Sequence, residues 1–122
     1  MSATRYRQID QSSRVEGASP HALVGILLDE AIDQIDAAAA AIRRGQRAHV
    51  AFARAQSILH ALEASLDHRA GGTTAALMQQ VYRETRRCLT RATDEIDPLW
   101  CNRARQTVKP IAEAWAQIAQ AA

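Results

Sequence analysis

The chain has 122 residues, of which 48% are hydrophobic and 23% charged, and its formal net charge is +2. This length fits one domain with a single core, and so mild a charge is no argument by itself for nucleic-acid binding. No run approaches 18 apolar residues and residues 1–17 lack the apolar core of a signal peptide, so we expect a cytoplasmic protein without membrane insertion.

The N-terminal segment, residues 1–18, is polar except for the anchors Tyr6, Ile9 and Val15. So few apolar side chains cannot build a core of their own. We expect a mobile arm, or one short helix, ahead of a folded domain that spans residues 19–122.

Helix-starting and helix-ending residues divide that domain into four segments. Ser and Asp cap helix N-termini, Pro is favoured in the first turn, and Gly ends helices. In chain order the signals are Ser19-Pro20, Gly45, Gly71-Gly72 followed by the candidate caps Thr73 and Thr74, and Asp97-Pro98.

Each segment carries apolar residues in a 4,3 repeat. The repeats are Leu28, Ile32, Ile35, Ala39 and Ile42; then Ala48, Phe52, Ala55, Leu59, Leu62 and Leu66; then Met78, Tyr82, Thr85, Leu89, Ala92 and Ile96; and finally Cys101, Ala104, Val108, Ile111, Trp115 and Ile118. This period is typical of helices that cross at about 20° in antiparallel bundles. With no period-2 alternation, the pattern predicts an all-α, antiparallel four-helix bundle with a short N-terminal arm or helix.

Pro110 interrupts the last segment, where it removes one helical hydrogen bond. The apolar repeat stays in phase from Val108 through Ile111 to Trp115. We therefore predict that the helix continues through Pro110 but bends there, and that Trp115 anchors its C-terminal half.

No pattern of residues indicates catalysis, a metal or another cofactor. None of the histidines has a second His or Glu at a metal-ligand spacing on a helix face, and the nearest pair, His60 and Glu63, fits a surface contact better. Cys88 and Cys101 are too few for a disulfide framework. Basic neighbours of Cys88 could lower its thiol pKa, but its place beside the apolar stripe favours a buried, inert thiol.

Basic residues gather in the last third of the chain. Two interpretations remain, a solvated bundle face and an anion-binding or nucleic-acid-binding patch, of which the first is the commoner. The residues are Arg83, Arg86, Arg87, Arg91, Arg103, Arg105 and Lys109.

Apolar residues exceed what the four stripes need. Second rows flank the stripes at Ile58, Ala61 and Ser65, at Leu77, Val81 and Cys88, and at Leu99, Trp100 and Ala112. The surplus indicates either a wide core face or an apolar groove that binds a partner helix.

Short motifs in a fixed order resemble the flagellin-specific secretion chaperones, the FliS family. They are Tyr6 with Gln8-Ile9, the Ala-Ser-Pro-His-Ala-Leu run at 18–23, Leu28-Asp29 with Ala31, Ala41-Ile42 with Gly45-Gln46, the Ile58–Asp67 stretch, Gly71-Gly72 with Leu77 and Tyr82, and Ala114-Trp115. The resemblance spans residues 6–118. Departures at Leu28, Glu30, the run Tyr82-Arg83-Glu84-Thr85, Ala92-Thr93 and Pro110 indicate a divergent member.

The resemblance implies a cytoplasmic export chaperone, with no enzymatic activity and no need of a nucleotide or metal. Its partner would be the amphipathic C-terminal segment of flagellin, bound one to one so that premature polymerisation is blocked, with other flagellar export components as further partners. The residues expected to contact it are Phe52, Ile58, Leu62, Leu77, Val81 and Tyr82, while Tyr6 and Ile9 of the arm would cover the empty groove. The rival functions are a basic bundle that binds nucleic acid and a helical adaptor or regulator unrelated to flagellin.

Overall fold

The computed structural model describes residues 17–121, so the arm prediction for residues 1–16, including Tyr6 and Ile9, lies outside the described part. Within that part the chain forms four helices and no strand. They are α2 (Pro20–Arg43), α3 (His49–Ala64), α4 (His68–Glu95) and α5 (Pro98–Ala121). The predicted all-α fold is confirmed.

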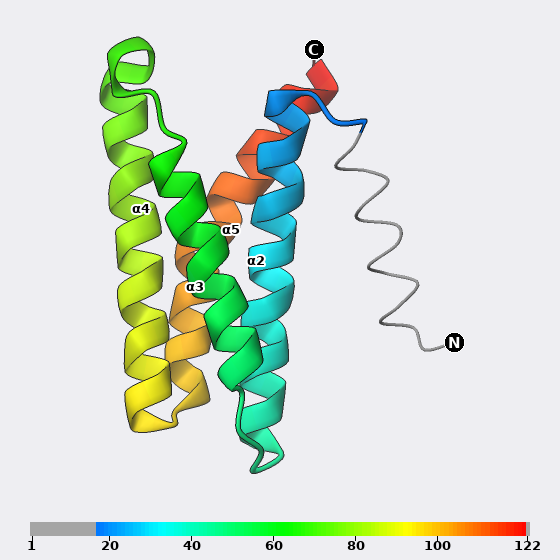
Figure 1. Cartoon of the computed structure of the whole chain (residues 1–122), viewed down its shortest axis with the longest axis vertical. Helices are drawn as coiled ribbons and strands as arrows, with labels where there is room; N and C mark the ends of the chain where they lie inside the picture. The colour runs from blue at the N-terminus through cyan, green and yellow to red at the C-terminus, as the bar shows by residue number, and fades with distance from the viewer. Residues whose placement is uncertain (1–16, 122) are drawn as a thin grey trace.

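The four helices run alternately up and down and surround one core (Figure 1). Helix α2 packs against α3 and α5, and α4 packs against the same two helices. Each helix thus contacts its neighbours in the chain, and the last closes the ring against the first. This is the antiparallel four-helix bundle that the apolar repeat predicted.

Local capping chemistry sets three of the helix boundaries. The Ser19 hydroxyl accepts a hydrogen bond from the Ala22 N–H at 3.1 Å, and Pro20 follows in the first turn. Beyond the end of α2, Gly45 has a φ of +72°, a conformation that glycine adopts without strain. At the start of α5, a carboxylate oxygen of Asp97 accepts from the Leu99 N–H at 2.9 Å.

The boundary between α3 and α4 differs from the prediction. Helix α3 ends at Ala64, well before the glycine pair, and α4 begins at His68 with Asp67 as its cap, not at Thr73 or Thr74. Asp67 accepts hydrogen bonds from two N–H groups of the first turn. Gly72 then leaves the helical conformation (φ 50°, ψ −126°), so the glycine pair kinks α4 instead of closing α3.

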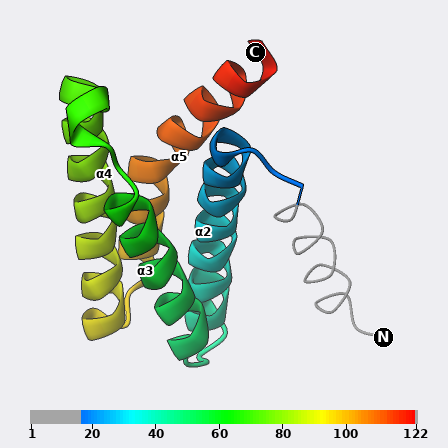
Figure 2. The same ribbon diagram turned by 45° about the horizontal axis from the view of Figure 1, so that its top comes forward.

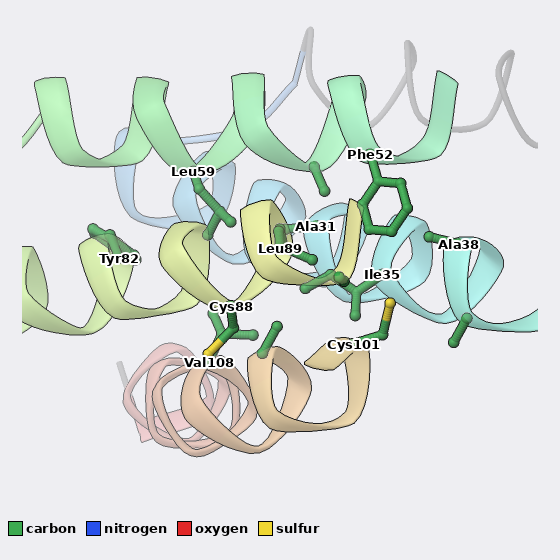
Figure 3. Close-up of a cluster of buried hydrophobic side chains, with 14 of the residues drawn as sticks. Ala31, Ile35, Ala38, Phe52, Leu59, Tyr82, Cys88, Leu89, Cys101 and Val108 are labelled. Carbon is green, nitrogen blue, oxygen red and sulfur yellow. The ribbon is translucent and has the colours of Figure 1, made fainter. Parts of the chain in front are cut away.

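The core follows the predicted stripes along most of their length (Figure 3). The fully buried large side chains come from all four helices: Leu28, Ile35, Leu59, Leu62, Tyr82, Leu89 and Val108. Alanines at the helix contacts allow the backbones to approach closely.

Two residues assigned to the stripes are not in the core. Ile96 is 72% exposed, because it lies at the C-cap of α4 in a left-handed conformation that turns it away from the stripe. Ile118 is 55% exposed, because it lies in the part of α5 beyond Pro110.

Helix α5 is continuous across Pro110 and bends, as predicted (Figure 2). The half that follows Pro110 leans away from α4 and stays beside the N-terminal half of α2. The bend therefore separates the C-terminal end of α5 from the N-terminal end of α4. A straight α5 would keep these two ends together.

Candidate functional site

The end of the bundle beside the bend holds an apolar hollow of about 380 Å³. We call it the Trp115 hollow. All four helices contribute to its lining, which includes Val24, Leu62, Leu66, Thr74, Ala75, Met78, Tyr82 and Trp115. Such a concave, mainly apolar site is suited to a few bulky apolar side chains.

Trp115 is held against the start of α2. Its ring stacks on the His21 ring with centroids 4.3 Å apart and planes 13° apart. Its indole N–H also donates a 2.8 Å hydrogen bond to the backbone oxygen of His21. A Cβ atom at Gly25 would lie 3.5 Å from the indole, an ordinary van der Waals distance, so the ring lies close against α2 at this point.

Trp115 also lines a second hollow of about 360 Å³, on the side of α2 that includes Ala18, Gly25 and Ile26. The indole is therefore the wall between two hollows.

The residues predicted to contact a partner do not form one surface. Phe52, Leu62 and Tyr82 are interior, with exposed fractions of 7%, 1% and 1%. Leu62 and Tyr82 lie at the lining of the Trp115 hollow, whereas Phe52 lines a different hollow at the opposite end of the bundle. A partner can reach these three only through the hollows.

The other three predicted residues are more accessible. Leu77 is 57% exposed, and Ile58 and Val81 are half-buried. Leu77 and Val81 are four residues apart and so lie on the same side of α4. The role of all six residues in binding stays a prediction.

The bulky apolar lining residues that were absent from the predicted site are Val24, Leu66, Met78 and Trp115. The last three had been assigned to core stripes. What the pattern did not show is that α3 ends at Ala64, well before the glycine pair. Together with the predicted bend of α5 at Pro110, this leaves these side chains at the end of the core with one side uncovered.

Burial alters the acid–base chemistry of side chains around the core. It raises the pKa of the Tyr82 phenol to about 12 and that of the Cys101 thiol to about 11. Burial also raises the pKa of the Cys88 thiol. The interpretation of both cysteines as buried free thiols is confirmed, and the raised pKa values keep them protonated and unreactive near neutral pH.

The basic residues of α4 and α5 are mostly paired with carboxylates. Arg83 and Arg86 both face Glu63, at 3.2 and 3.6 Å. Further pairs join Arg87 to Glu84, Arg91 to Glu95, Arg105 to Asp36 and Lys109 to Glu113. Within residues 17–121 only Arg103 of this predicted basic set has no carboxylate partner, so the cluster matches a solvated, charge-balanced face better than an anion-binding patch.

Arg103 instead stacks on Trp100. Its guanidinium carbon lies 4.8 Å from the ring centroid, and those of Arg87 and Arg91 lie at 5.8 and 4.4 Å. These contacts join the end of α4 to the start of α5 and explain why Trp100, from the second apolar row, is only half-buried.

No helix among the described residues is long and apolar enough to cross a membrane. No group of three or more His, Cys, Asp or Glu side chains among them is arranged to hold a metal ion.

Comparison with known proteins gives concordant matches. The family described as "Flagellar protein FliS" matches residues 2–122. The flagellar secretion chaperone FliS of Vibrio cholerae serotype O1 is 27% identical over 119 residues, which cover 93% of this chain and 85% of that protein. The flagellar secretion chaperone FliS of Salmonella typhimurium is 31% identical over 116 residues, covering 93% of this chain and 86% of that protein.

Proposed function

Since this chain belongs to the FliS family of flagellar secretion chaperones, as a divergent member, we propose that its client is flagellin, whose C-terminal amphipathic segment it holds before export. The observation that carries the proposal is the Trp115 hollow, an apolar concavity that all four helices line in a chain of this family. The proposed site of action is the cytoplasm, and the proposed mechanism is binding without catalysis.

The geometry suits an amphipathic helix better than an extended peptide. Such a helix presents bulky residues at i, i+3, i+4 and i+7 along one side. One or two of these would enter the Trp115 hollow above Leu62 and Tyr82. The next would lie along α4 on Leu77 and Val81, which extend the apolar surface away from the hollow.

A bound tail cannot polymerise through the same apolar side. The free tail is disordered in this proposal, so binding has to offset the entropy of ordering it. Apolar burial supplies about 25 cal/mol per Å² for that purpose. We propose a one-to-one complex, which is consistent with one Trp115 hollow in the described part of each chain.

A matched pair of substitutions tests the proposal without disturbing the core. Thr74 and Thr73 are neighbouring exposed residues, but only Thr74 lines the hollow. We expect Thr74→Trp to fill the mouth of the hollow and to weaken binding of full-length flagellin at least tenfold in calorimetry, with Thr73→Trp as the control. Flagellin that lacks its C-terminal segment should not bind either variant or the parent protein. Equal binding by the two tryptophan variants would place the client elsewhere.

The salt dependence of binding separates this function from nucleic-acid binding. A complex held by apolar contacts loses little affinity between 50 and 200 mM salt, whereas phosphate contacts lose it steeply. Binding that falls with salt as steeply as a nucleic-acid complex would favour the basic-bundle alternative.

We also propose that residues 1–18 cover the empty client site through Tyr6 and Ile9. The support is the position of Ala18, near the start of the described residues, which lines the second hollow together with Trp115. Deleting residues 1–10 should then increase the fluorescence of an apolar dye, and client should reverse the increase. Unchanged dye fluorescence would count against a covering arm.

A further inference from the structure

A second hollow with a different chemistry lies at the opposite end of the bundle. It measures about 440 Å³ and lies between the turn that joins α2 to α3 and the turn that joins α4 to α5. Its lining combines apolar residues of three helices with the α2–α3 turn, and includes Ile42, Arg47, Phe52, Ala92 and Ile96. We call it the Ile96 hollow.

Ile96 is unfavourable for folding in two respects. Its φ of +51° places a β-branched residue in the left-handed region, which glycine or asparagine occupies with less strain. Its side chain is also 72% exposed, so little apolar burial compensates for the strain. A bulky residue that the turn does not need, at the edge of a hollow, is suited to contact with a partner.

The other edge of the hollow is positively charged. The exposed residues Arg43, Arg44 and Arg47 follow one another around the α2–α3 turn, and none has a carboxylate partner within residues 17–121. Arg43 and Arg44 donate to the side-chain oxygens of Asn102 and Gln46, which are neutral. Arg83, Arg86, Arg87 and Arg91 of α4, in contrast, all have carboxylate partners.

The C-terminal end of α2 explains part of this charge, because cations stabilise the last turn of a helix. It does not explain Arg47, which lies beyond the helix and lines the hollow itself. Two carboxylates near this end lie on the other side, Asp94 in the last turn of α4 and Asp97 in the α4–α5 turn, and Asp97 already accepts the Leu99 N–H. Positive charge and exposed apolar surface therefore face each other across the hollow.

From this arrangement we propose that the Ile96 hollow binds an acidic segment of a protein partner, with one bulky apolar side chain next to its carboxylates. The apolar side chain would enter above Phe52 and contact Ile96, and the carboxylates would pair with Arg47 and Arg44. This surface is separate from the Trp115 hollow, since the two lie at opposite ends of α4. The chain thus has two docking surfaces, so a client and a second protein can bind together.

Fluorescence anisotropy with defined peptides tests the chemistry directly. The probe is a fluorescein-labelled peptide of sequence Asp-Glu-Leu-Phe-Glu-Asp, added to the full chain at low salt. Its controls are a peptide with alanine in place of Leu-Phe and a peptide with lysine in place of the acidic residues. We expect the probe to bind and each control to bind at least tenfold more weakly, because both the charge and the apolar side chain are required.

Two substitutions with matched controls locate the binding. Ile96→Asn removes the apolar edge but suits the left-handed conformation, so it should raise the urea midpoint of unfolding while weakening probe binding at least tenfold. Arg47→Glu should weaken it further. Their controls are Val50→Asn and Arg54→Glu, exposed residues of α3 that do not line the hollow, and Thr74→Trp, which blocks only the other hollow. All three controls should bind the probe normally.

Several outcomes would overturn the proposal. The first is that Ile96→Asn binds the probe as tightly as the parent protein does. The second is that the alanine peptide binds as tightly as the probe, and the third is that the probe does not bind even at millimolar concentration. Tighter binding of oligothymidine or of phosphatidylserine vesicles, lost in Arg47→Glu, would assign the surface to nucleic acid or to a membrane instead. Self-association of the chain that Ile96→Asn abolishes would assign it to a second copy.

Discussion

The indole N–H of Trp115 donates to the backbone oxygen of His21 at 2.8 Å while the two rings stack, and these residues are separated by 94 positions in the chain. One pair of side chains thus joins the first turn of α2 to the last part of α5. Since Trp115 also separates two hollows, the same contact determines the shape of the proposed client site.

Replacing Trp115 should measure what this contact contributes. Trp115→Phe keeps much of the ring packing but loses the hydrogen bond, which is worth about 1 kcal/mol. Trp115→Ala also loses the stack and the burial, and because the ring is only half-buried we expect about 2–4 kcal/mol, toward the lower end of the usual range for such truncations. Urea unfolding gives both values. A cost for Trp115→Ala no larger than that for Trp115→Phe would show that the ring contributes little packing.

Pro110→Ala should stabilise the protein. The substitution restores a backbone N–H that can bond to the Gln106 carbonyl, and Pro110 is exposed, so no cavity forms. The unfolded chain gains freedom when proline is lost, which offsets part of the effect, and we expect a net gain of about 1–2 kcal/mol. Thermal and urea unfolding measure the change. Destabilisation by this substitution would mean that the bend is required to place Trp115 against His21.

Alkaline pH should destabilise the fold through Tyr82. Its phenol ionises near 10 in the unfolded chain, and burial raises its pKa to about 12 in the folded one. The stabilising contribution is therefore complete below pH 10 and is lost as the pH rises from 10 to about 12. The loss amounts to about 2–3 kcal/mol at most.

Urea unfolding between pH 8 and 12 tests this dependence. Tyr82→Phe should flatten the decline above pH 10, and Tyr6→Phe is the control for the other tyrosine. Cys101, whose pKa burial raises to about 11, adds a separate decline between about pH 9 and 11 that both variants keep. If the free energy of unfolding depends on pH in the same way in Tyr82→Phe and in the parent protein, ionisation of Tyr82 does not cause the decline.

One change, glycine to alanine, should have opposite effects at two positions. Gly25 is inside α2, and a Cβ there would meet the Trp115 ring at an ordinary 3.5 Å, so Gly25→Ala should stabilise by about 0.5–1 kcal/mol. Gly72 has a φ of +50° at the kink of α4, where Ala is strained, and Gly72→Ala should destabilise by about 1–2 kcal/mol. Thermal unfolding compares the two. Stabilisation at both positions would mean that the kink straightens without loss of packing.

The sequence by itself determined three helix boundaries, the start and end of α2 and the start of α5, because capping depends on a few neighbouring residues. Ser19, Gly45 and Asp97 all have the predicted roles. The sequence also determined the fold class, because the 4,3 repeat of its apolar residues fits only helices with one apolar side. The resemblance to the family followed from several short motifs in a fixed order. These motifs are spread over the whole chain, so no single helix contains them all.

Only the tertiary structure decided which apolar residues remain accessible. Exposure depends on where a neighbouring helix ends, and α3 ends at Ala64 because Asp67 begins a new helix before the glycine pair. The predicted contact residues Phe52 and Tyr82 consequently lie at the linings of two different hollows, and Leu77 lies outside both. Periodicity places a residue on a side of its own helix, but the cover over that side comes from other helices, whose lengths and bends are set by caps and a proline elsewhere in the chain.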